Sequence, residues 1–317
     1  IGFWGSFLDD AFVPEGSEIL ECAAALLGEI VLRPAGDGKS FLPDYVESEK
    51  ANLVDKIRSE VNDKLQYSLS RLRERMCEGE AYGIGKLGSE EQARAITGEA
   101  LYNRYRQVLE TAPIYLYYCG SADTDRVEAA FRAAFVGLPR TQRRPLPETL
   151  ALAEPRGPVR RFEDRLDVTQ GKLTMGFRIG GGFRNLEDAA CLSLLNAVYG
   201  GSTNSKLFLN VREKLSLCYF ASSSLAMSKG VLLVYSGVEF SNFQRAEDEI
   251  LAQLEACRNG EITPEELEAA RRSVVGSLRA SLDAQGRLEE YWLNRFVTGT
   301  DFTPEQLAER VEQVTLE

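Results

Sequence analysis

An arginine and a tyrosine seven residues apart, Arg212 and Tyr219, are the side chains of this sequence best suited to chemistry. Apolar residues recur before and after Arg212 at steps of three and four, which predicts a helix. They are Leu207, Phe208, Val211 and Leu215. The alternation that follows predicts a strand. Because a helix running directly into a strand can aim a guanidinium and a phenol at one point, we expect the two side chains to bind a carbonyl or a developing oxyanion.

Two glycines and two polar residues stand before this predicted helix. Gly200 and Gly201 predict a flexible turn, because glycine adopts backbone conformations that other residues avoid. Ser202 and Asn204 are candidates for the N-cap, since their side chains can accept hydrogen bonds from the free backbone amides at the start of a helix. The sequence therefore predicts a loop that leads into the helix carrying Arg212.

The predicted strand, residues 217–223, places alternate side chains on one face of a sheet. Leu217, Tyr219 and Ala221 are therefore expected to point the same way. A structural interpretation is also open, in which Arg212 is buried at a helix C-terminus and satisfies carbonyl groups beside a core tyrosine. The residue types alone leave both interpretations standing.

Residues 200–219 resemble the pitrilysin/insulinase family of zinc peptidases, which carry an inverted H-x-x-E-H motif, and in particular the second half of their two-lobed unit. Residues 166–178 also resemble the strand that opens that lobe. In the family, the small-residue loop, the arginine and the tyrosine face the zinc across the substrate chamber. The resemblance implies that Arg212 and Tyr219 are catalytic residues that bind the scissile carbonyl. It implies substrate binding by Gly200, Gly201, Ser202 and Asn204.

The same resemblance bears on the metal. Active relatives carry E-x(6)-E on the long helix of the first lobe, and the second glutamate is the third zinc ligand. Glu49 matches the first glutamate, but Lys56 stands at the position of the second. An ammonium group cannot ligate zinc while protonated, and its charge repels the metal. The chain also contains no histidine. The resemblance therefore implies no metal and no cofactor in this chain, with Lys56 at the lost ligand position.

Proline and glycine divide the chain near residue 150. We expect a first peptidase-like lobe at 1–140 that is incomplete at its N-terminus, a linker at 141–160, and a second lobe at 161–317 that carries the arginine and the tyrosine. The predicted mixture of helices and hairpin-like strands indicates the α+β class. The resemblance implies two similar lobes, each a mostly antiparallel sheet covered by helices, that enclose a peptide chamber.

Periodicity locates the individual elements. A strand and a turn are predicted at 1–13, and strands at 114–119, 162–179, 218–225 and 230–238. Helices are predicted at 17–31, 44–77, 124–135, 186–198, 243–258 and 264–288, with two short ones in 89–110. Setting Pro43 on Pro264 aligns the apolar positions of a long helix in each half. This internal repeat favours duplicated lobes.

Composition and charge limit the classes of protein to which this chain can belong. With 317 residues, 44% of them hydrophobic, the chain can bury two ordinary cores. A net charge of -11 with scattered basic residues argues against nucleic acid and anionic membranes as partners. No apolar run approaches the roughly 20 residues of a membrane span. The six cysteines show no C-x-x-C spacing, so we expect free core thiols in a reduced, cytoplasmic protein. Without histidine, no Ser-His or Cys-His nucleophile can form.

Taken with the resemblance, these observations predict a noncatalytic, substrate-binding subunit of a heterodimeric zinc metallopeptidase, similar to the zinc-less partner in bacterial pairs and to the α subunit of the mitochondrial processing peptidase. Its expected partners are a zinc-binding homologous subunit, or a second copy in a homodimer, and an extended peptide substrate. Zinc is expected in the partner subunit. The chain would then be inactive alone and contribute to peptide hydrolysis with that partner.

Two alternatives are open. The first is a peptidase-derived scaffold or interaction protein with no role in proteolysis, like core subunits of respiratory complexes. The second is a complete zinc site restored by sequence before Ile1, where an inverted motif counted back from Lys56 would fall. Lys56 argues against this second alternative, because it stands where the third ligand would be.

Overall fold

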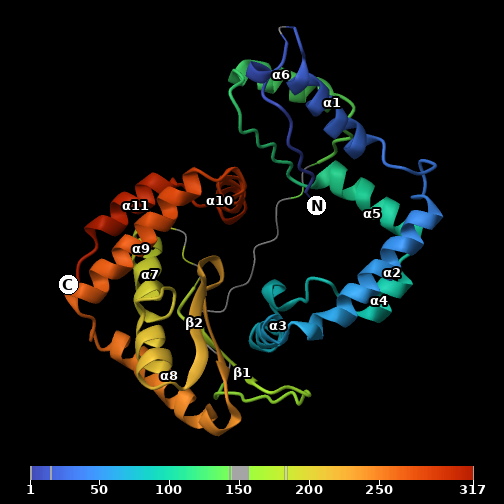
Figure 1. The fold of residues 1–317 in the computed structure, drawn as a ribbon. Coiled ribbons are helices and arrows are strands. Elements are labelled where there is room, and N and C mark those ends of the chain that lie inside the picture. The colour runs from blue at the N-terminus through green and yellow to red at the C-terminus, as the bar shows by residue number, and fades with distance from the viewer. Residues whose placement is uncertain are drawn as a thin grey trace. The chain divides into compact units, whose positions relative to one another are not determined.

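The computed structural model of the chain divides into two compact units (Figure 1). The first unit comprises Ile1–Arg58 and Leu87–Glu148, and the second comprises Ser59–Lys86 and Thr149–Glu317. The structure describes residues 2–14, 16–142, 144, 157–181, 183 and 185–316. Residues 145–156, most of the predicted linker, lie outside this set, so the division of the chain at 141–160 stays a prediction.

The first unit is built from helices whose starts can be read from their capping residues. The helices are α1 (Ile19–Leu32), α2 (Pro43–Ser59), α4 (Glu90–Ala95), α5 (Gly98–Thr111) and α6 (Thr124–Ala134). Ser89 and Gln92 form a reciprocal capping box at the start of α4. The side chains of Thr97 and Asp123 accept backbone hydrogen bonds at the starts of α5 and α6. Each cap satisfies amides that a helix leaves unpaired, so the predicted helices in this unit form close to their expected positions.

Helices α1 and α6 lie side by side and form the small core of the first unit (Figure 1). Leu20, Ala24 and Ala130 are each at least nine-tenths buried. Gly28 permits the close approach, because a Cβ atom on it would lie 2.5 Å from the carbonyl oxygen of Ala134. Small residues at the crossing therefore bring the two backbones together.

The strands predicted for the first unit do not form. Apart from an isolated bridge between Gly36 and Phe41, the described residues of this unit contain no strand pairing. Residues 114–119 lie outside any regular element, and within 1–13 only a short 3₁₀ turn forms, at Asp10–Phe12. A strand exists only when a second strand pairs with it, so β-type periodicity alone did not determine the structure of these segments.

The long helix predicted for residues 44–77 is interrupted. Helix α2 ends at Ser59, a 3₁₀ turn covers Glu60–Asn62, and α3 (Lys64–Met76) then begins. The Asp63 side chain accepts hydrogen bonds from the backbone amides of the second and third residues of α3, Leu65 and Gln66. Because this carboxylate caps a new helix, it stabilises the break at a position where the apolar periodicity continues.

The second unit contains a three-stranded antiparallel sheet in the order β1-β3-β2. The strands are β1 (Gly171–Arg178), β2 (Cys218–Ala226) and β3 (Val231–Val238). Strands β2 and β3 form a hairpin through a turn that ends at Gly230, whose φ is +59°. A Cβ atom on Gly230 would lie 2.2 Å from the carbonyl oxygen of Gly180, so this turn requires glycine. The predicted hairpin is confirmed, whereas the strand predicted at 162–179 is shorter.

Five α-helices of the second unit, in addition to α3, lie among the described residues from 185 onward. They are α7 (Leu186–Tyr199), α8 (Phe243–Arg258), α9 (Pro264–Leu282), α10 (Gln285–Thr298) and α11 (Pro304–Gln313). Helix α7 packs on the sheet, and α9 and α11 pack against α7 (Figure 1). The core between them includes Leu173, Leu194, Val234 and Ile250. The α+β class is confirmed. No helix among the described residues is both long enough and apolar enough to cross a membrane.

Two features of the helices bear on the predicted repeat. Helices α2 and α9 each begin at the proline that the repeat aligns, Pro43 and Pro264. The predicted helix at 264–288 is divided, because Ala284 adopts an extended backbone between α9 and α10. Since the described part of the first unit lacks a sheet, the prediction of two lobes with similar sheets is supported only in the second unit.

Helix α3 packs against β1 within the second unit. A Cβ atom on Gly176 would lie 2.4 Å from the sulfur of Met76, so the strand and the helix are in close contact. Nearby, Arg178 forms an ion pair with Glu80, and both side chains are almost completely buried. The distance from Arg178 Nη1 to Glu80 Oε2 is 3.1 Å, and Nη2 also donates to the carbonyl oxygen of Met76. This buried ion pair joins residues from the two halves of the sequence in one unit.

Candidate functional site

Arg212 lies on a π-helix, Leu207–Lys214, rather than on the ordinary α-helix that the periodicity suggested. The backbone amide of Leu215 donates to the carbonyl oxygen of Asn210, five residues earlier, at 3.1 Å. Leu207 and Val211 are completely buried and fix one face of this helix in the core. The π form is rare, usually lasts a single turn, and occurs often at functional sites. An eight-residue π-helix is therefore a distinctive local feature of this chain.

The predicted N-caps of this helix are wrong. The helix follows Lys206, which makes no side-chain cap, and the Ser205 hydroxyl accepts a hydrogen bond from the amide of Phe208. Ser202 instead donates from its hydroxyl to the carbonyl oxygen of Ala197, at 3.0 Å, and accepts from the amide of Asn204. These hydrogen bonds place Ser202 and Asn204 in the turn between α7 and the π-helix, where neither residue caps the π-helix.

A left-handed residue follows the π-helix. Ser216 has a φ of +49°, and among the described residues it is the only one other than glycine with a positive φ. Its amide donates to the carbonyl oxygen of Arg212, and the amide of Leu217 donates to that of Val211. A non-glycine residue in this conformation costs about 1–2 kcal/mol. The surrounding hydrogen bonds therefore hold the chain in a strained turn between Arg212 and the next strand.

Tyr219 is the extra residue of a β-bulge. Cys218 pairs with Val238 and Phe220 pairs with Gly237, so Tyr219 has no partner on β3. A bulge redirects the side chain of its extra residue. Tyr219 is 55% exposed, and its hydroxyl donates to Glu239 Oε1 at 3.4 Å.

The bulge overturns one prediction about this strand. Leu217 and Ala221, which the alternation placed on the same face as Tyr219, are each 3% exposed. The expectation of a shared face is therefore wrong for Tyr219. A simple alternation of side chains fails here because the bulge inserts one unpaired residue between Leu217 and Ala221.

Arg212 is also accessible. Its side chain is 42% exposed, its Nη1 lies 3.4 Å from Glu213 Oε1, and its guanidinium lies 4.7 Å from the centre of the Phe208 ring. In the described structure no hydrogen bond joins Arg212 to Tyr219. The exposure of both side chains contradicts the interpretation of a buried arginine beside a core tyrosine, and leaves a cation and a phenol available to a ligand.

The glycine turn before the π-helix is tightly packed. The amides of Gly200 and Gly201 both donate to the carbonyl oxygen of Asn196, and the carbonyl oxygen of Gly200 accepts from the amide of Ser223 on β2. A Cβ atom on Gly200 would lie 2.6 Å from Ser223 Oγ and 2.7 Å from Leu207 Cδ1. One on Gly201 would lie 2.5 Å from Asn196 Nδ2. Close packing accounts for both glycines, and their role in substrate binding stays a prediction.

The region of the lost zinc ligand lies on helix α2. Glu49 and Lys56 are both exposed, and Glu49 accepts a hydrogen bond from Asn52. No group of three or more histidine, cysteine, aspartate or glutamate side chains suited to a metal occurs in the part of the chain that the structure describes. A zinc site needs three or four such donors, and this sequence contains no histidine. Among the residues that the structure describes, the possible metal ligands are therefore not grouped as a zinc site requires.

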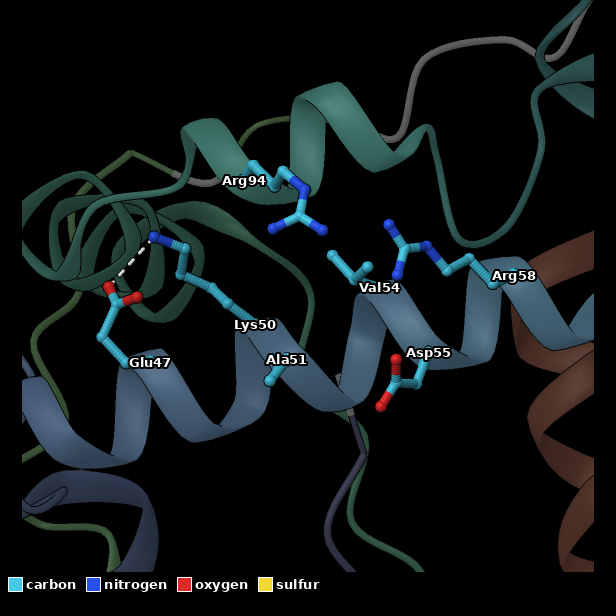
Figure 2. A pocket seen from close by; sticks show the side chains of 7 residues that line it. All are labelled: Glu47, Lys50, Ala51, Val54, Asp55, Arg58 and Arg94. Atoms are coloured by element: carbon cyan, nitrogen blue, oxygen red, sulfur yellow. Dashed lines mark hydrogen bonds and ion pairs between the residues drawn. The ribbon is translucent and has the colours of Figure 1, made fainter.

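A cleft of about 270 Å³ runs along α2 and α4 (Figure 2). Its charged lining residues are Glu47, Lys50, Asp55, Arg58 and Arg94. Three of these five carry positive charge. The guanidiniums of Arg58 and Arg94 also bind Glu90, and these hydrogen bonds lower the pKa of its carboxyl to about 2. The positive side chains make this cleft unsuitable for a divalent cation.

The side chains that support Arg212 were missed by sequence reasoning. Lys206 binds Glu266 of α9, and Asn210 binds Gln253 of α8. Glu266 carries one local signal, the T-x-x-E capping box that starts α9. That signal predicts the start of a helix and gives no indication of a contact with Lys206.

Comparisons with known proteins agree on one family. Residues 95–274 match the family described as peptidase M16 inactive domain. A protein of Bacillus subtilis named probable inactive metalloprotease YmfF is 30% identical over 314 residues, which cover 98% of this chain and 72% of the relative.

Solved structures share the fold of this chain. A conserved protein from Enterococcus faecalis is 25% identical, with a TM-score of 0.77 over 98% of this chain and 72% of that chain. The peptidase M16 inactive domain from Pseudomonas fluorescens shares the fold at 20% identity, with a TM-score of 0.66 over 93% of this chain and 73% of that one.

Proposed function

The chain belongs to the M16 peptidase family, and from that membership we propose that it is a noncatalytic, substrate-binding subunit of a two-chain zinc peptidase. The partner is a homologous subunit that supplies the zinc and the general base. This chain supplies Arg212 and Tyr219 to the carbonyl oxygen of the scissile peptide bond. The cytoplasmic location and the two-lobed chamber belong to the same proposal.

One observation carries the proposal: the backbone between Arg212 and Tyr219 is irregular at three successive places. These are the π-helix Leu207–Lys214, the left-handed Ser216 and the bulge at Tyr219. Each irregularity carries a cost in free energy, and such features cluster at sites where a side chain must be aimed. The result is two exposed hydrogen-bond donors on a well-packed support. A charged guanidinium and a phenol are suited to stabilise negative charge on an oxygen atom.

The residue types of this chain support this division of labour between two subunits. Zinc does not fit its residues, because histidine is lacking and Lys56 stands at the matched ligand position. The description of the matched family as an inactive domain supports the same division. A subunit of this kind contributes binding and electrostatic stabilisation, and hydrolysis depends on its partner.

The sheet of the second unit suggests how a substrate is held. Strand β2, which carries Tyr219, is an edge strand in the observed order β1-β3-β2. An edge strand offers backbone groups with which an extended peptide can pair, and this pairing demands little of the peptide's sequence. We therefore propose an unstructured peptide as the ligand, lying along β2 and passing Tyr219.

Isothermal titration calorimetry with the purified chain tests this binding mode. Unstructured peptides are expected to bind weakly, and the same sequences held within a folded protein are expected not to bind, since only an extended backbone can pair with a strand edge. Tight binding of a nucleotide or of DNA would contradict the proposal. Binding of folded proteins without binding of peptides would favour a scaffold protein instead.

A further inference from the structure

The π-helix that carries Arg212 begins beside an ion pair between a buried lysine and a half-buried glutamate. Lys206 Nζ lies 2.8 Å from Glu266 Oε1, and the two side chains are 9% and 21% exposed. The second oxygen of Glu266 accepts a hydrogen bond from the amide of Thr263 at 2.9 Å. Because Glu266 is fixed in the capping box of α9, the lysine is bound to a rigid carboxylate.

The surroundings of this ion pair are poorly solvated. The thiol of Cys257 lies close enough to both charges to be affected by them, and burial raises the pKa of this thiol to about 11. In such surroundings an ammonium or a carboxylate left alone is strongly disfavoured. The two charges are therefore expected to stay together, and they fix the chain at the residue where the π-helix begins.

A second contact fixes the middle of the helix. Asn210 Nδ2 donates to Gln253 Oε1 of α8 at 2.9 Å, and Gln253 Nε2 donates to Glu249 at 2.7 Å. The carbonyl oxygen of Asn210 also accepts the five-residue hydrogen bond from Leu215. Arg212 lies two residues beyond Asn210 and directly after the buried Val211.

The form of the helix decides where Arg212 points. An α-helix has 3.6 residues per turn, and bonding over five residues places more residues in each turn. If the segment rewound as an α-helix while its start stayed in place, Arg212 would rotate about the helix axis. The contact at Lys206 thus influences the direction of a side chain six residues away.

We propose that Lys206 and Glu266 are positioning residues, whose ion pair holds residues 207–214 in the π form and thereby aims Arg212. Neither residue touches the substrate. The inference rests on the proposed function only in so far as Arg212 acts on the scissile carbonyl. The effect on the helix itself is independent of that role.

Hydrogen–deuterium exchange of the full-length chain tests the effect on the helix directly. In Lys206→Met and in Glu266→Gln, the amides of residues 207–217, including Leu215, are expected to exchange at least tenfold faster, because the charge that fixes the helix start is lost. Glu266→Gln is informative because glutamine preserves the capping box of α9. Lys206→Arg keeps the cation and is expected to restore slow exchange.

Thr263→Ala is the matched control, since it removes the cap of α9 and keeps both charges. In this variant, the backbone amides of residues 207–217 are expected to exchange at the same rate as in the unaltered chain. Unchanged exchange in both Lys206→Met and Glu266→Gln would overturn the proposal. Faster exchange in Thr263→Ala equal to that in Glu266→Gln would also overturn it, because the cap rather than the ion pair would then be responsible.

Activity of the heterodimer separates this inference from the proposed function. Glu266→Gln is expected to lower kcat about tenfold with little change in KM, and to have no further effect when Arg212→Ala is already present. Additive losses in the double variant would contradict action through Arg212. If exchange responds as expected while Arg212→Ala alone leaves kcat unchanged, the proposed function fails and the effect on the helix stands.

Discussion

Arg212→Ala is expected to lower the kcat of the reconstituted heterodimer by about 10²–10³-fold, the usual effect of removing one donor to a developing oxyanion. Arg212 is exposed on the π-helix and is held there by packing of its neighbour Val211, so its removal should leave the fold intact. Because the interaction strengthens in the transition state, kcat and kcat/KM should fall together. The zinc content of the heterodimer should be unchanged. Steady-state kinetics with a peptide substrate measures the effect.

Two further variants complete this experiment. Tyr219→Phe keeps the ring on the bulge and removes the hydroxyl, so a smaller loss of kcat is expected. Arg258→Ala, which removes an exposed arginine paired with Glu255 at the end of α8, is the matched control and should leave kcat unchanged. Turnover that survives both Arg212→Ala and Tyr219→Phe within a factor of two would show that the two residues are wrongly assigned.

Arg178→Met is expected to destabilise the second unit by about 3–5 kcal/mol, because it leaves the buried carboxylate of Glu80 without its cation. The guanidinium also donates to the carbonyl oxygen of Met76, which loses a hydrogen bond in the variant. Urea unfolding followed by circular dichroism measures the loss. If the single variant does not fold, Arg178→Met with Glu80→Gln, which removes both charges, is expected to recover a folded chain.

The control for Arg178 is an arginine in an exposed ion pair. Arg310 binds Glu187 through two hydrogen bonds, with side chains 27% and 56% exposed. Exposed ion pairs contribute little to stability, so Arg310→Met should shift the urea midpoint only slightly. Equal shifts for Arg178→Met and Arg310→Met would contradict the structural role given to the buried ion pair.

Local signals in the sequence were sufficient for many of the helices and for the hairpin. Pro43 and Pro264 mark the first residues of α2 and α9, and the Ser89 box marks the start of α4. These signals act within one or two helical turns, so the residues that interact are close together in the sequence. Arg212 and Tyr219 could be identified as a pair for the same reason, because they are only seven residues apart in the sequence.

The geometry of the candidate site depends on contacts that no local pattern records. The π-helix is held by Glu266 and Gln253, which are far from it in sequence. The glycine turn before it is tied to β2 at Ser223, and the bulge at Tyr219 exists only against β3. Residues 114–119 give the opposite case, because their strand-like pattern has no pairing partner in the described structure. The sequence pattern therefore identified Arg212 and Tyr219 as candidate site residues, but it did not predict the directions in which their side chains point.

The most direct test of the proposed division of labour is to measure zinc content and peptide hydrolysis together, for the chain purified from its full-length gene and for its mixture with an H-x-x-E-H homologue from the same genome. The chain alone is expected to hold no stoichiometric zinc and to hydrolyse no peptide, and Lys56→Glu should restore neither, because a single carboxylate leaves the metal without its other ligands. The mixture should hydrolyse peptides with one zinc per heterodimer. One tightly held zinc in the chain alone, together with peptide hydrolysis, would contradict the noncatalytic assignment.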